Sequence, residues 1–404
     1  MILIAGGGVG GLTLALMLHQ AGIACRVFEA VGEVRPLGVG INALPHSMRE
    51  LAALDLLPRL DDIGIRTRTL TYANHLGQVI WSEPRGLYAG HEAPQYSLHR
   101  GRLQTMLWDV VTERMGAPLA GHRLVGFDQD AAGVTARFQT ADGVETVDGA
   151  ALVGADGIHS GLRGILHADD GGIRWNGISM WRGAVDWPAF DGGDAMVIAG
   201  DAVAKLVLYP IAPGETAGTR LTNWVIYARV AEAGASLPGR ESWSRVGRYA
   251  DFRQFVERLR LPFVDVAAMI RATGEIFEYP MCDRDPLPWW TQGRVTLLGD
   301  AAHPMYPVGS NGASQAILDA RCLVDRLAAG PVVGALAEYD AIRRPATGEI
   351  VAANRVGGPE RVIDFVAGRA PAGFARVEDV ASAAELHGIV RGYAQLAGFA
   401  VTAR

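Results

Sequence analysis

The first part of the chain alternates short apolar runs with glycine-rich turns. Met1–Ala5 is apolar, too short for a helix and followed directly by glycines, so we expect a buried parallel strand. The leucine-rich stretch after it has the apolar density of a helix packed on a sheet, and Gly22 is placed to end that helix. A second apolar run, Ala24–Phe28, leads into Glu29. The pattern predicts a strand, a helix and a second strand that open an α/β domain.

Hydrophobic positions further along the chain predict a second, antiparallel sheet. Its long strands are expected at Ile178–Val185, Ala204–Ile211 and Leu221–Arg229, in a region where tryptophan and methionine recur. Alternation over Gly64–Trp81 indicates further strands joined by a hairpin turn at Asn74–Gly77. We therefore expect this sheet to be separate from the parallel one.

The remaining segments are predicted to form short strands, a loop and several helices. Short strands are predicted at Ala150–Ala155, Glu275–Tyr279 and Arg294–Leu298, and a hairpin at residues 123–148. Pro36, Gly38 and Gly40 mark a loop at Gly32–Asn42. Helices are expected at Pro45–Leu54, from Ser97–Leu103 onward, over 240–272, and at Ser310–Leu327 and Leu336–Arg343, with an alanine-rich and mostly helical remainder. Pro345 should break or kink the helix that it follows.

The amino-acid composition argues against several classes of binding partner. A formal net charge of −6 provides no basic field for nucleic acid or an anionic membrane. The three cysteines form no Cys-x-x-Cys pair, so neither a disulfide framework nor a metal site is expected. The N-terminus enters a strand at once, unlike a signal peptide, and no apolar run is long enough to span a membrane. We expect a soluble, cytoplasmic protein, either a monomer or a homodimer.

The glycines after the first strand match G-x-G-x-x-G. In this motif Gly6 makes the tight strand-to-helix turn, Gly8 lets the backbone approach a pyrophosphate, and Gly11 lets helix and strand pack closely. Glu29 ends the second strand, where a carboxylate can accept a hydrogen bond from a ribose 2′-OH and would repel a 2′-phosphate. The arrangement favours FAD or NAD over NADP at this site. A glycine-rich loop without a ligand is the alternative.

Two further motifs accompany this fingerprint. Gly154–Arg163 matches G-A-D-G-x-x-S-x-x-R, and Gly299–Gly309, a Gly-Asp motif that ends in Pro-Val-Gly, continues into Asn311 and Gly312. With all three motifs in this order, residues 1 to about 355 resemble the group A flavoprotein aromatic hydroxylases, which have the p-hydroxybenzoate hydroxylase fold. Stretches outside the shared motifs resemble the phenazine hydroxylases of the 5-methylphenazine-1-carboxylate 1-monooxygenase type: Arg35–Asn42, Trp81–Gly86, Pro94–Gly101, Met180–Gly183 and Tyr279–Pro288.

This resemblance implies a fold class and a reaction. The fold would be α/β, with a discontinuous Rossmann-like FAD-binding domain at 1–70, 98–172 and 275–345, an antiparallel-sheet substrate domain at 71–97 and 173–274, and a helical C-terminal segment at 346–404. FAD would be held non-covalently, and NAD(P)H would bind transiently as co-substrate, because no second G-x-G-x-x-G follows a strand. The reduced flavin would react with O2 to form a C4a-hydroperoxide, which would hydroxylate an aromatic or N-heteroaromatic ring. With a phenazine-carboxylate-like substrate, hydroxylation could replace the carboxylate and release CO2.

The resemblance also implies which residues hold the cofactor. A helix that begins near Ser310 would point its free N–H groups at the flavin N1–C2=O edge, where negative charge collects on reduction. Pro307, Gly309 and Gly312 would position the isoalloxazine there. The flavin itself would carry out the reaction, and no side chain is assigned a catalytic role. Asp300 would hold the ribityl chain, and Arg100 would support FAD, although a solvated surface pair with Arg102 is the alternative. The full cofactor set is Gly6, Gly8, Gly11, Glu29, Gly40, Arg100, Val125, Asp156, Gly157, Arg163, Asp300, Pro307, Gly309, Asn311 and Gly312.

Substrate contacts are expected from the second sheet and from the third motif. Alternation places Ile178, Met180 and Arg182 on one face of their strand and Ser179, Trp181 and Gly183 on the other. The resemblance favours Met180, Arg182, Trp224 and Pro304 as substrate residues, and it gives His303 a structural role. Arg182 could pair with a substrate carboxylate; an inter-strand ion pair is the alternative, and core packing is the alternative for each sheet residue.

Two other functions remain compatible with the motifs. An FAD-dependent oxidase or dehydrogenase would need a substrate-activating base, and no convincing one is evident in the sequence. A non-catalytic flavin-binding protein would tolerate the loss of Asp300 or Gly309, and both are present. Faster bleaching of the flavin by NAD(P)H when an aromatic ligand is added would favour the hydroxylase.

Overall fold

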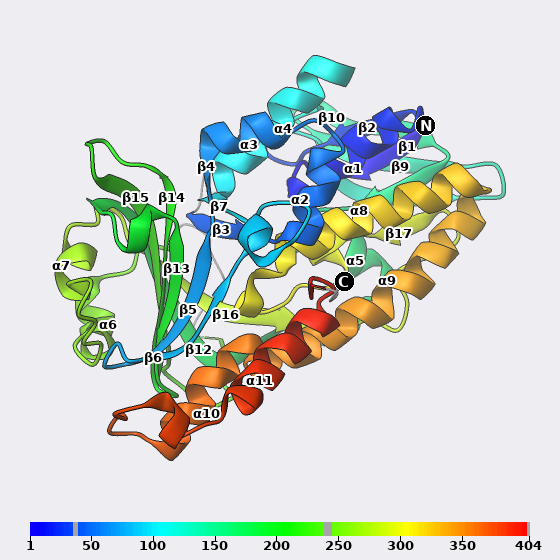
Figure 1. Ribbon diagram of the computed structural model, residues 1–404. Coiled ribbons are helices and arrows are strands. Elements are labelled where there is room, and N and C mark those ends of the chain that lie inside the picture. Colours follow the sequence, from blue (N-terminus) through cyan, green and yellow to red (C-terminus); the bar gives the residue numbers. More distant parts are fainter. Residues whose placement is uncertain (35–38, 238–244, 402–404) are drawn as a thin grey trace.

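A parallel four-stranded sheet assembled from distant parts of the chain forms the first domain (Figure 1). The computed structural model describes residues 1–34, 39–237 and 245–401, so the loop expected at Pro36 and Gly38 lies largely outside the described residues. The sheet has the order β17-β11-β1-β2, and each neighbouring pair is parallel. Its strands are β1 (Ile2–Ala5), β2 (Cys25–Phe28), β11 (Ala151–Gly154) and β17 (Val295–Leu297). The predicted short apolar strands are thus confirmed.

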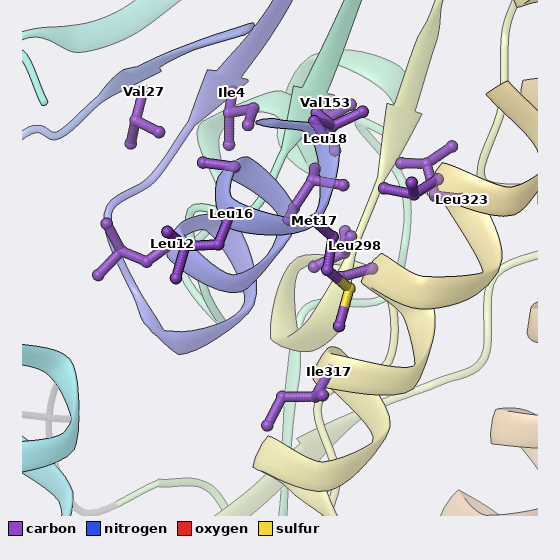
Figure 2. Close-up of a cluster of buried hydrophobic side chains, with 14 of the residues drawn as sticks. Ile4, Leu12, Leu16, Met17, Leu18, Val27, Val153, Leu298, Ile317 and Leu323 are labelled. Atoms are coloured by element: carbon purple, nitrogen blue, oxygen red, sulfur yellow. The ribbon is translucent and has the colours of Figure 1, made fainter. Parts of the chain in front are cut away.

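Helix α1 (Val9–Gln20) packs the leucine-rich stretch against this sheet. Its residues from Gly11 to Leu18 are buried, and Gly22 follows the helix with a φ of +71°. Figure 2 shows the resulting core, in which side chains of β1, β2 and β11 meet those of α1 and α8 (Gly312–Ala329). The labelled members are Ile4, Leu12, Leu16, Met17, Leu18, Val27, Val153, Leu298, Ile317 and Leu323.

The predicted second sheet has seven strands in the order β16-β12-β15-β14-β13-β5-β6. Every neighbouring pair is antiparallel except β13 with β5, which is parallel. The strands are β5 (Thr69–Asn74), β6 (Val79–Pro84), β12 (Ile173–Pro188), β13 (Ala195–Gly200), β14 (Ala204–Pro213), β15 (Thr219–Arg229) and β16 (Phe277–Arg284). Since β5 begins at Thr69 and β16 extends to Arg284, the sheet reaches beyond the ranges expected for the substrate domain, whose exact limits stay a prediction.

Two small antiparallel sheets complete the strand content of the described residues. One has the order β10-β9-β8, with β8 (Arg123–Gln129), β9 (Val134–Thr140) and β10 (Gly143–Gly149). The other has the order β3-β7-β4, with β3 (Gly40–Ala43), β4 (Gly64–Arg66) and β7 (Tyr96–His99). Because Gly40 contacts Asn223 and Tyr209, this second small sheet joins the two domains.

The seven-stranded sheet is covered on both faces, as Figure 1 shows. Short helices α6 (Tyr249–Val256) and α7 (Val266–Arg271) pack on one face. The opposite face is turned toward the first domain and toward the C-terminal helices α10 (Arg361–Arg369) and α11 (Ala383–Leu396). A ligand between the two domains would therefore meet only this second face.

Two helix predictions need correction. The described part of 240–272 contains the separate helices α6 and α7, not one continuous helix. Pro345 does not break its helix, because α9 (Val332–Arg355) continues through it with buried residues on both sides, including Leu336 and Ile350; the alternative, a kink, stays a prediction. Packing therefore outweighs the lost backbone hydrogen bond. The other helices are α2 (Pro45–Ala52), α3 (Leu57–Ile63), α4 (Arg100–Met115) and α5 (Gly161–Leu166), with 3₁₀ turns at Gly86–Ala89, Asp191–Gly193, Gly299–Ala301, Val308–Ser310, Gly358–Glu360 and Val377–Asp379.

Candidate functional site

The glycines of the first motif divide into two that are enclosed and one that is open. Gly6 has a φ of +118°, and a Cβ there would lie 2.3 Å from the Ala155 carbonyl oxygen. A Cβ on Gly11 would lie 2.0 Å from the Gly6 carbonyl oxygen. At Gly8, the N-cap of α1, a Cβ would meet no described atom within 4 Å. Gly6 and Gly11 therefore permit the turn itself, whereas Gly8 leaves its backbone accessible to a ligand.

Glu29 is fixed beside this loop. Its carboxylate accepts hydrogen bonds from the backbone N–H of Gly7, at 2.7 Å, and of Val31, at 2.9 Å. Gln104 of α4 donates to the Gly7 carbonyl at 2.8 Å, which holds the loop from the other side. Each Glu29 oxygen keeps a second lone pair. The position suits a ribose hydroxyl, and that contact stays a prediction.

The second motif lies directly against the first. Asp156 follows β11, and its Oδ2 accepts hydrogen bonds from the N–H groups of Gly161, at 2.8 Å, and Leu162, at 3.3 Å. Its Oδ1 is buried and has no hydrogen-bond partner among the described residues, and burial raises the pKa of Asp156. Gly157, with a φ of +79°, has no described atom within 4 Å of a Cβ position. These two residues thus offer an unpaired oxygen and an open backbone.

Arg163 of this motif is fully buried and bonded to neighbouring protein groups. Its Nη1 donates to the Ala301 and Ala302 carbonyls at 3.3 and 2.9 Å, and its Nη2 donates to the Asp285 carbonyl at 3.0 Å. Its Nε pairs with Asp170 at 2.5 Å, and its side chain has no exposed surface. The Arg163 guanidinium, expected among the cofactor residues, is thus bonded to protein groups through Nε and both Nη atoms, and a contact with the cofactor stays a prediction. Its hydrogen bonds tie the turn of the third motif to α5.

The third motif brings Asp300 to the start of α8. Asp300 is exposed, and its Oδ1 lies 3.9 Å from where a Gly312 Cβ would be. Asn311 is the N-cap of α8 and makes no side-chain capping hydrogen bond. Pro307 is exposed and Pro304 is buried, on either side of Tyr306. The predicted residues Pro307, Gly309, Asn311 and Gly312 thus surround the open end of this helix.

His303 belongs to a buried polar network behind this turn. Its Nε2 lies 2.5 Å from Oδ2 of Asp319, which also accepts from the Gly299 N–H at 3.1 Å. Arg343 donates to Oδ1 of Asp319 at 2.7 Å. Burial alone would raise the pKa of Asp319, but the charges and hydrogen bonds of His303 and Arg343 lower it to about 2. These bonds fix the Gly299 turn, which supports the structural role expected for His303.

Two other predicted cofactor residues lie at the edges of the site. Arg100 is the first residue of α4, has an exposed side chain, and donates its backbone N–H to Val39 at 2.9 Å. Val125 is 47% exposed and lies at an irregularity of β8 between Leu124 and Gly126. Their contacts with a cofactor stay predictions.

Met180 and Arg182 lie on the sheet face that is turned toward the third motif. Met180 packs in a cluster with Tyr227, Tyr279, Tyr306 and Val308, among others. Nη2 of Arg182 donates to the Gly40 carbonyl at 2.6 Å, and its Cζ lies 5.9 Å from the centre of the Tyr279 ring. The expected alternation is confirmed, because Trp181 packs on the opposite face.

Trp224, which was expected to contact the substrate, lies on the sheet face opposite to Met180. It pairs across the strands with Gly183, so it shares the face of Trp181 and not that of Met180. There it is fully buried, stacks on Phe252 and donates its indole N–H to Thr273 at 2.8 Å. Its neighbours Val225 and Tyr227 occupy the face that was expected for it. Alternation within one strand was predictable, but the register of two strands was not.

A pocket at the domain junction includes residues that the motifs do not reveal. It lies between the sheet and the Gly309–Ser310 turn, and it is closed by C-terminal residues: Pro359, Val390 and Phe399. Tyr393 of α11 approaches the same turn, with its hydroxyl 2.9 Å from Nδ2 of Asn311. The spacing of Leu386, Val390 and Tyr393 on one helix face is the only sequence signal for this contact.

Comparison with known proteins identifies the family. The family described as FAD binding domain matches residues 1–246 and 282–353. The chain belongs to this family. FAD is accordingly its cofactor, and the residues present fit it: the backbone is open at Gly8 and Gly157, and a carboxylate stands at the start of α8. Residues after 353 lie outside the match.

Curated relatives of this FAD-binding protein are aromatic hydroxylases. It is 44% identical to phenazine 1,6-dicarboxylic acid hydroxylase PhzS of Lysobacter antibioticus, over 88% of this chain and 89% of the relative. It is 31% identical to 3-hydroxybenzoate 6-hydroxylase 1 of Aquipseudomonas alcaligenes, over 86% of each chain. The protein is thus an FAD-dependent aromatic monooxygenase by its relatives as well as by its motifs.

Solved structures share the fold of this FAD-binding protein. A salicylate hydroxylase substrate complex matches with a TM-score of 0.75 at 20% identity, covering all of this chain and 98% of the other. Klebsiella pneumoniae HpxO in complex with FAD and uric acid matches with a TM-score of 0.72 at 24% identity, covering 99% and 93%. Within residues 1–34, 39–237 and 245–401, no helix is long and apolar enough to cross a membrane, and no group of side chains is suited to hold a metal ion.

Proposed function

We propose that this monooxygenase hydroxylates a flat aromatic or N-heteroaromatic ring that carries a carboxylate, with phenazine carboxylates as the leading class. Its most similar curated relative named above is a hydroxylase of a phenazine dicarboxylic acid, and 3-hydroxybenzoate is the named substrate of the other. Bound FAD supplies the chemistry, because it accepts electrons from NAD(P)H and activates O2. The protein must therefore bind the ring, orient it and exclude water.

The observation that carries this proposal is the environment of Arg182. Its guanidinium is partly buried, and its Nε has no hydrogen-bond partner among the described residues. No described carboxylate pairs with it, so the inter-strand ion pair considered above is not found there. Burial lowers the pKa of Arg182, and a buried charge without a counter-ion is destabilising. A substrate carboxylate would supply that counter-ion.

The surroundings of Arg182 suit a flat ring. Met180 and Tyr279 form an apolar and aromatic wall on this sheet face, and Tyr306 of the third motif packs in the same cluster. The Tyr227 hydroxyl is buried there without a hydrogen-bond partner in the described residues, so it can bind a hydroxyl group or a ring nitrogen of the substrate. Arg182 would fix one end of the ring, and these side chains would keep water from the reacting carbon.

We further propose that the flavin lies between this sheet face and the start of α8. The uncapped N–H groups of α8 would face the N1–C2=O edge, with Asp300 beside them. Gly6, Gly8 and Glu29 would hold the other end of the cofactor. In this placement Pro304 and Pro307 flank the ring system from below. The choice between NADH and NADPH, a cytoplasmic location and a monomeric or homodimeric state stay predictions.

The oxygen balance defines two possible products. One atom of O2 enters the ring, the other leaves as water, and NAD(P)H provides two electrons. If the ring carbon that bears the carboxylate is attacked, the carboxylate leaves as CO2; otherwise it is retained. Mass spectrometry of the product distinguishes the two outcomes.

The test compares aromatic acids with their uncharged analogues. Phenazine-1-carboxylate, salicylate and hydroxybenzoates should accelerate NAD(P)H oxidation and yield hydroxylated products, whereas the corresponding amides should do so weakly. In Arg182→Met we expect KM for the best acid to rise at least about tenfold, since hydrogen bonds to a charged group contribute about 1.5–3 kcal/mol. Arg229→Met is the matched control, because Arg229 is exposed and also donates to a backbone carbonyl, that of Asn176. Production of hydrogen peroxide alone across the panel, or an unchanged KM in Arg182→Met, would refute the proposal.

A further inference from the structure

The C-terminal segment contacts the turn that leads into α8. It lies beyond residue 353, the last residue that the family model matches. In Figure 1 helix α11 runs beside α9, and Ala397, which follows α11, contacts Gln315 in the first turn of α8. Val308 packs in contact with the 3₁₀ turn at Gly358–Glu360, and Gly358 faces Tyr393. The segment therefore touches the predicted isoalloxazine site, which the sequence motifs assign only to residues 299–312.

One hydroxyl group connects the two parts. Oη of Tyr393 accepts a hydrogen bond from Nδ2 of Asn311 at 2.9 Å and donates to Oδ1 of Asn354 at 2.6 Å, with the Val308 carbonyl 3.3 Å away. Asn311 also donates to the Gly309 carbonyl, and Asn354 donates to the Tyr306 carbonyl. Two carbonyls next to the turn, those of Tyr306 and Gly309, thus accept hydrogen bonds from this network.

The turn needs such support because its backbone is strained. Gly309 and Ser310 have φ values of +69° and +59°, and a serine rarely adopts such an angle. Strained conformations persist only where the surrounding structure determines them. A Cβ on Gly309 would lie 2.4 Å from the Tyr393 hydroxyl oxygen, so the phenol occupies the space beside this glycine. Tyr393 therefore fills the space beside Gly309 and also forms a hydrogen bond with Asn311 at the end of the turn.

A second contact fixes the first turn of α8. Nε2 of Gln315 donates to the Ala397 carbonyl and to Oδ1 of Asn311, both at 3.2 Å. Arg343 in turn donates to Oε1 of Gln315 at 2.7 Å. The residues after α11 are therefore tied to the same helix end as Tyr393. Two contacts, which meet at Asn311, hold this end in place.

We propose that Tyr393 is a positioning residue for the flavin: it holds the Pro307–Asn311 turn so that the N–H groups at the start of α8 face the N1–C2=O edge. The C-terminal segment is thereby part of the cofactor site. This proposal rests on the flavin placement given above and is independent of the substrate. Since these N–H groups stabilise the negative charge of reduced flavin, loosening the turn weakens the binding of reduced FAD more than that of oxidised FAD.

The test measures cofactor properties of the FAD-loaded protein in the absence of an aromatic substrate. Tyr393→Phe keeps the buried ring and removes only the hydroxyl. We expect an approximately tenfold loss of preference for reduced over oxidised FAD, which lowers the two-electron midpoint potential by about 30 mV, the shift that corresponds to a tenfold change in equilibrium constant. Anaerobic redox titration gives this potential. Tyr96→Phe is the control, because it removes a comparable hydroxyl contact, with Asp61, on β7.

The outcomes separate positioning from general stability. An unchanged potential in Tyr393→Phe, or an equal shift in Tyr96→Phe, overturns the proposal. Asn354→Ala provides a second variant in case the first retains FAD poorly. If both residues act through one network, the double variant shifts the potential by less than the sum of the single shifts; additive shifts contradict the network. The midpoint potentials are measured without substrate, so they do not depend on the proposed substrate class. The two proposals can therefore fail separately.

Discussion

Glu360 should make the stability of the protein fall as the pH rises through neutrality. The residue is 4% exposed and precedes α10. Burial is the largest effect on its carboxyl group; Asp364 raises the pKa further, whereas Lys205 and the Gly309 N–H lower it, and the resulting pKa is about 7. In the unfolded chain the value would be near 4.5. The folded state therefore binds the proton more tightly than the unfolded state does.

The sign and magnitude follow from this difference in pKa. With a raised pKa in the folded state, the stabilisation is complete below about pH 4.5 and is lost as the pH rises to about 7. At about 1.4 kcal/mol for each pKa unit, the loss is up to about 3 kcal/mol. Glu360→Gln keeps the size and the acceptor oxygen but cannot ionise. This variant should exceed the wild type in stability by up to about 3 kcal/mol at pH 8 and by little at pH 5.

Urea unfolding followed by circular dichroism at pH 5, 6, 7 and 8 measures this difference. Comparing variants at each pH cancels the contribution of other titrating groups, including Asp156 and Asp283, whose pKa values burial also raises. Glu378→Gln is the matched control, since it removes the same charge from an exposed side chain. A stability difference between Glu360→Gln and wild type that is the same at pH 5 and pH 8 would refute the reasoning.

Two further predictions concern the site. Glu29→Arg should retain FAD poorly, because it replaces the carboxylate that accepts from Gly7 and Val31 with a cation; equilibrium dialysis measures the affinity, and an unchanged value would remove the ribose assignment. Trp224→Phe should lose about 1 kcal/mol of stability with its hydrogen bond to Thr273 and leave KM for the aromatic substrate unchanged. A large change in KM would instead return Trp224 to the substrate site.

Local sequence patterns predicted the parts of the site that depend on one chain segment. Gly6 and Gly11 are enclosed by neighbouring backbone as the fingerprint requires. Alternation placed Met180 and Trp181 on opposite faces, as the structure confirms. Both inferences rest on geometry within a few residues, where spacing alone determines the direction of a side chain.

Features that depend on distant segments could not be predicted. The face of Trp224 depends on its register with β12, and no residue of β15 reveals that register. Arg163 occurs at its motif position, but the direction of its guanidinium depends on the carbonyls of residues 285, 301 and 302. Tyr393 reaches Asn311 across 82 positions of sequence, from a helix without any motif.

The strand order of the parallel sheet has a consequence for synthesis of the chain. β1 and β2 leave the ribosome first, but β11 and β17, which complete the sheet on the other side of β1, are separated from β2 by about 120 and 270 residues. At about 5–20 residues per second, the nascent chain must wait roughly 15–50 s for β17. The edge of β1 is unpaired until β11 emerges, and the edge of β11 is then unpaired until β17 emerges, so an apolar strand edge stays open to aggregation throughout this interval. In the flavin placement proposed above, the cofactor site is complete only after α8 has emerged, so we expect FAD to bind at a late step of folding.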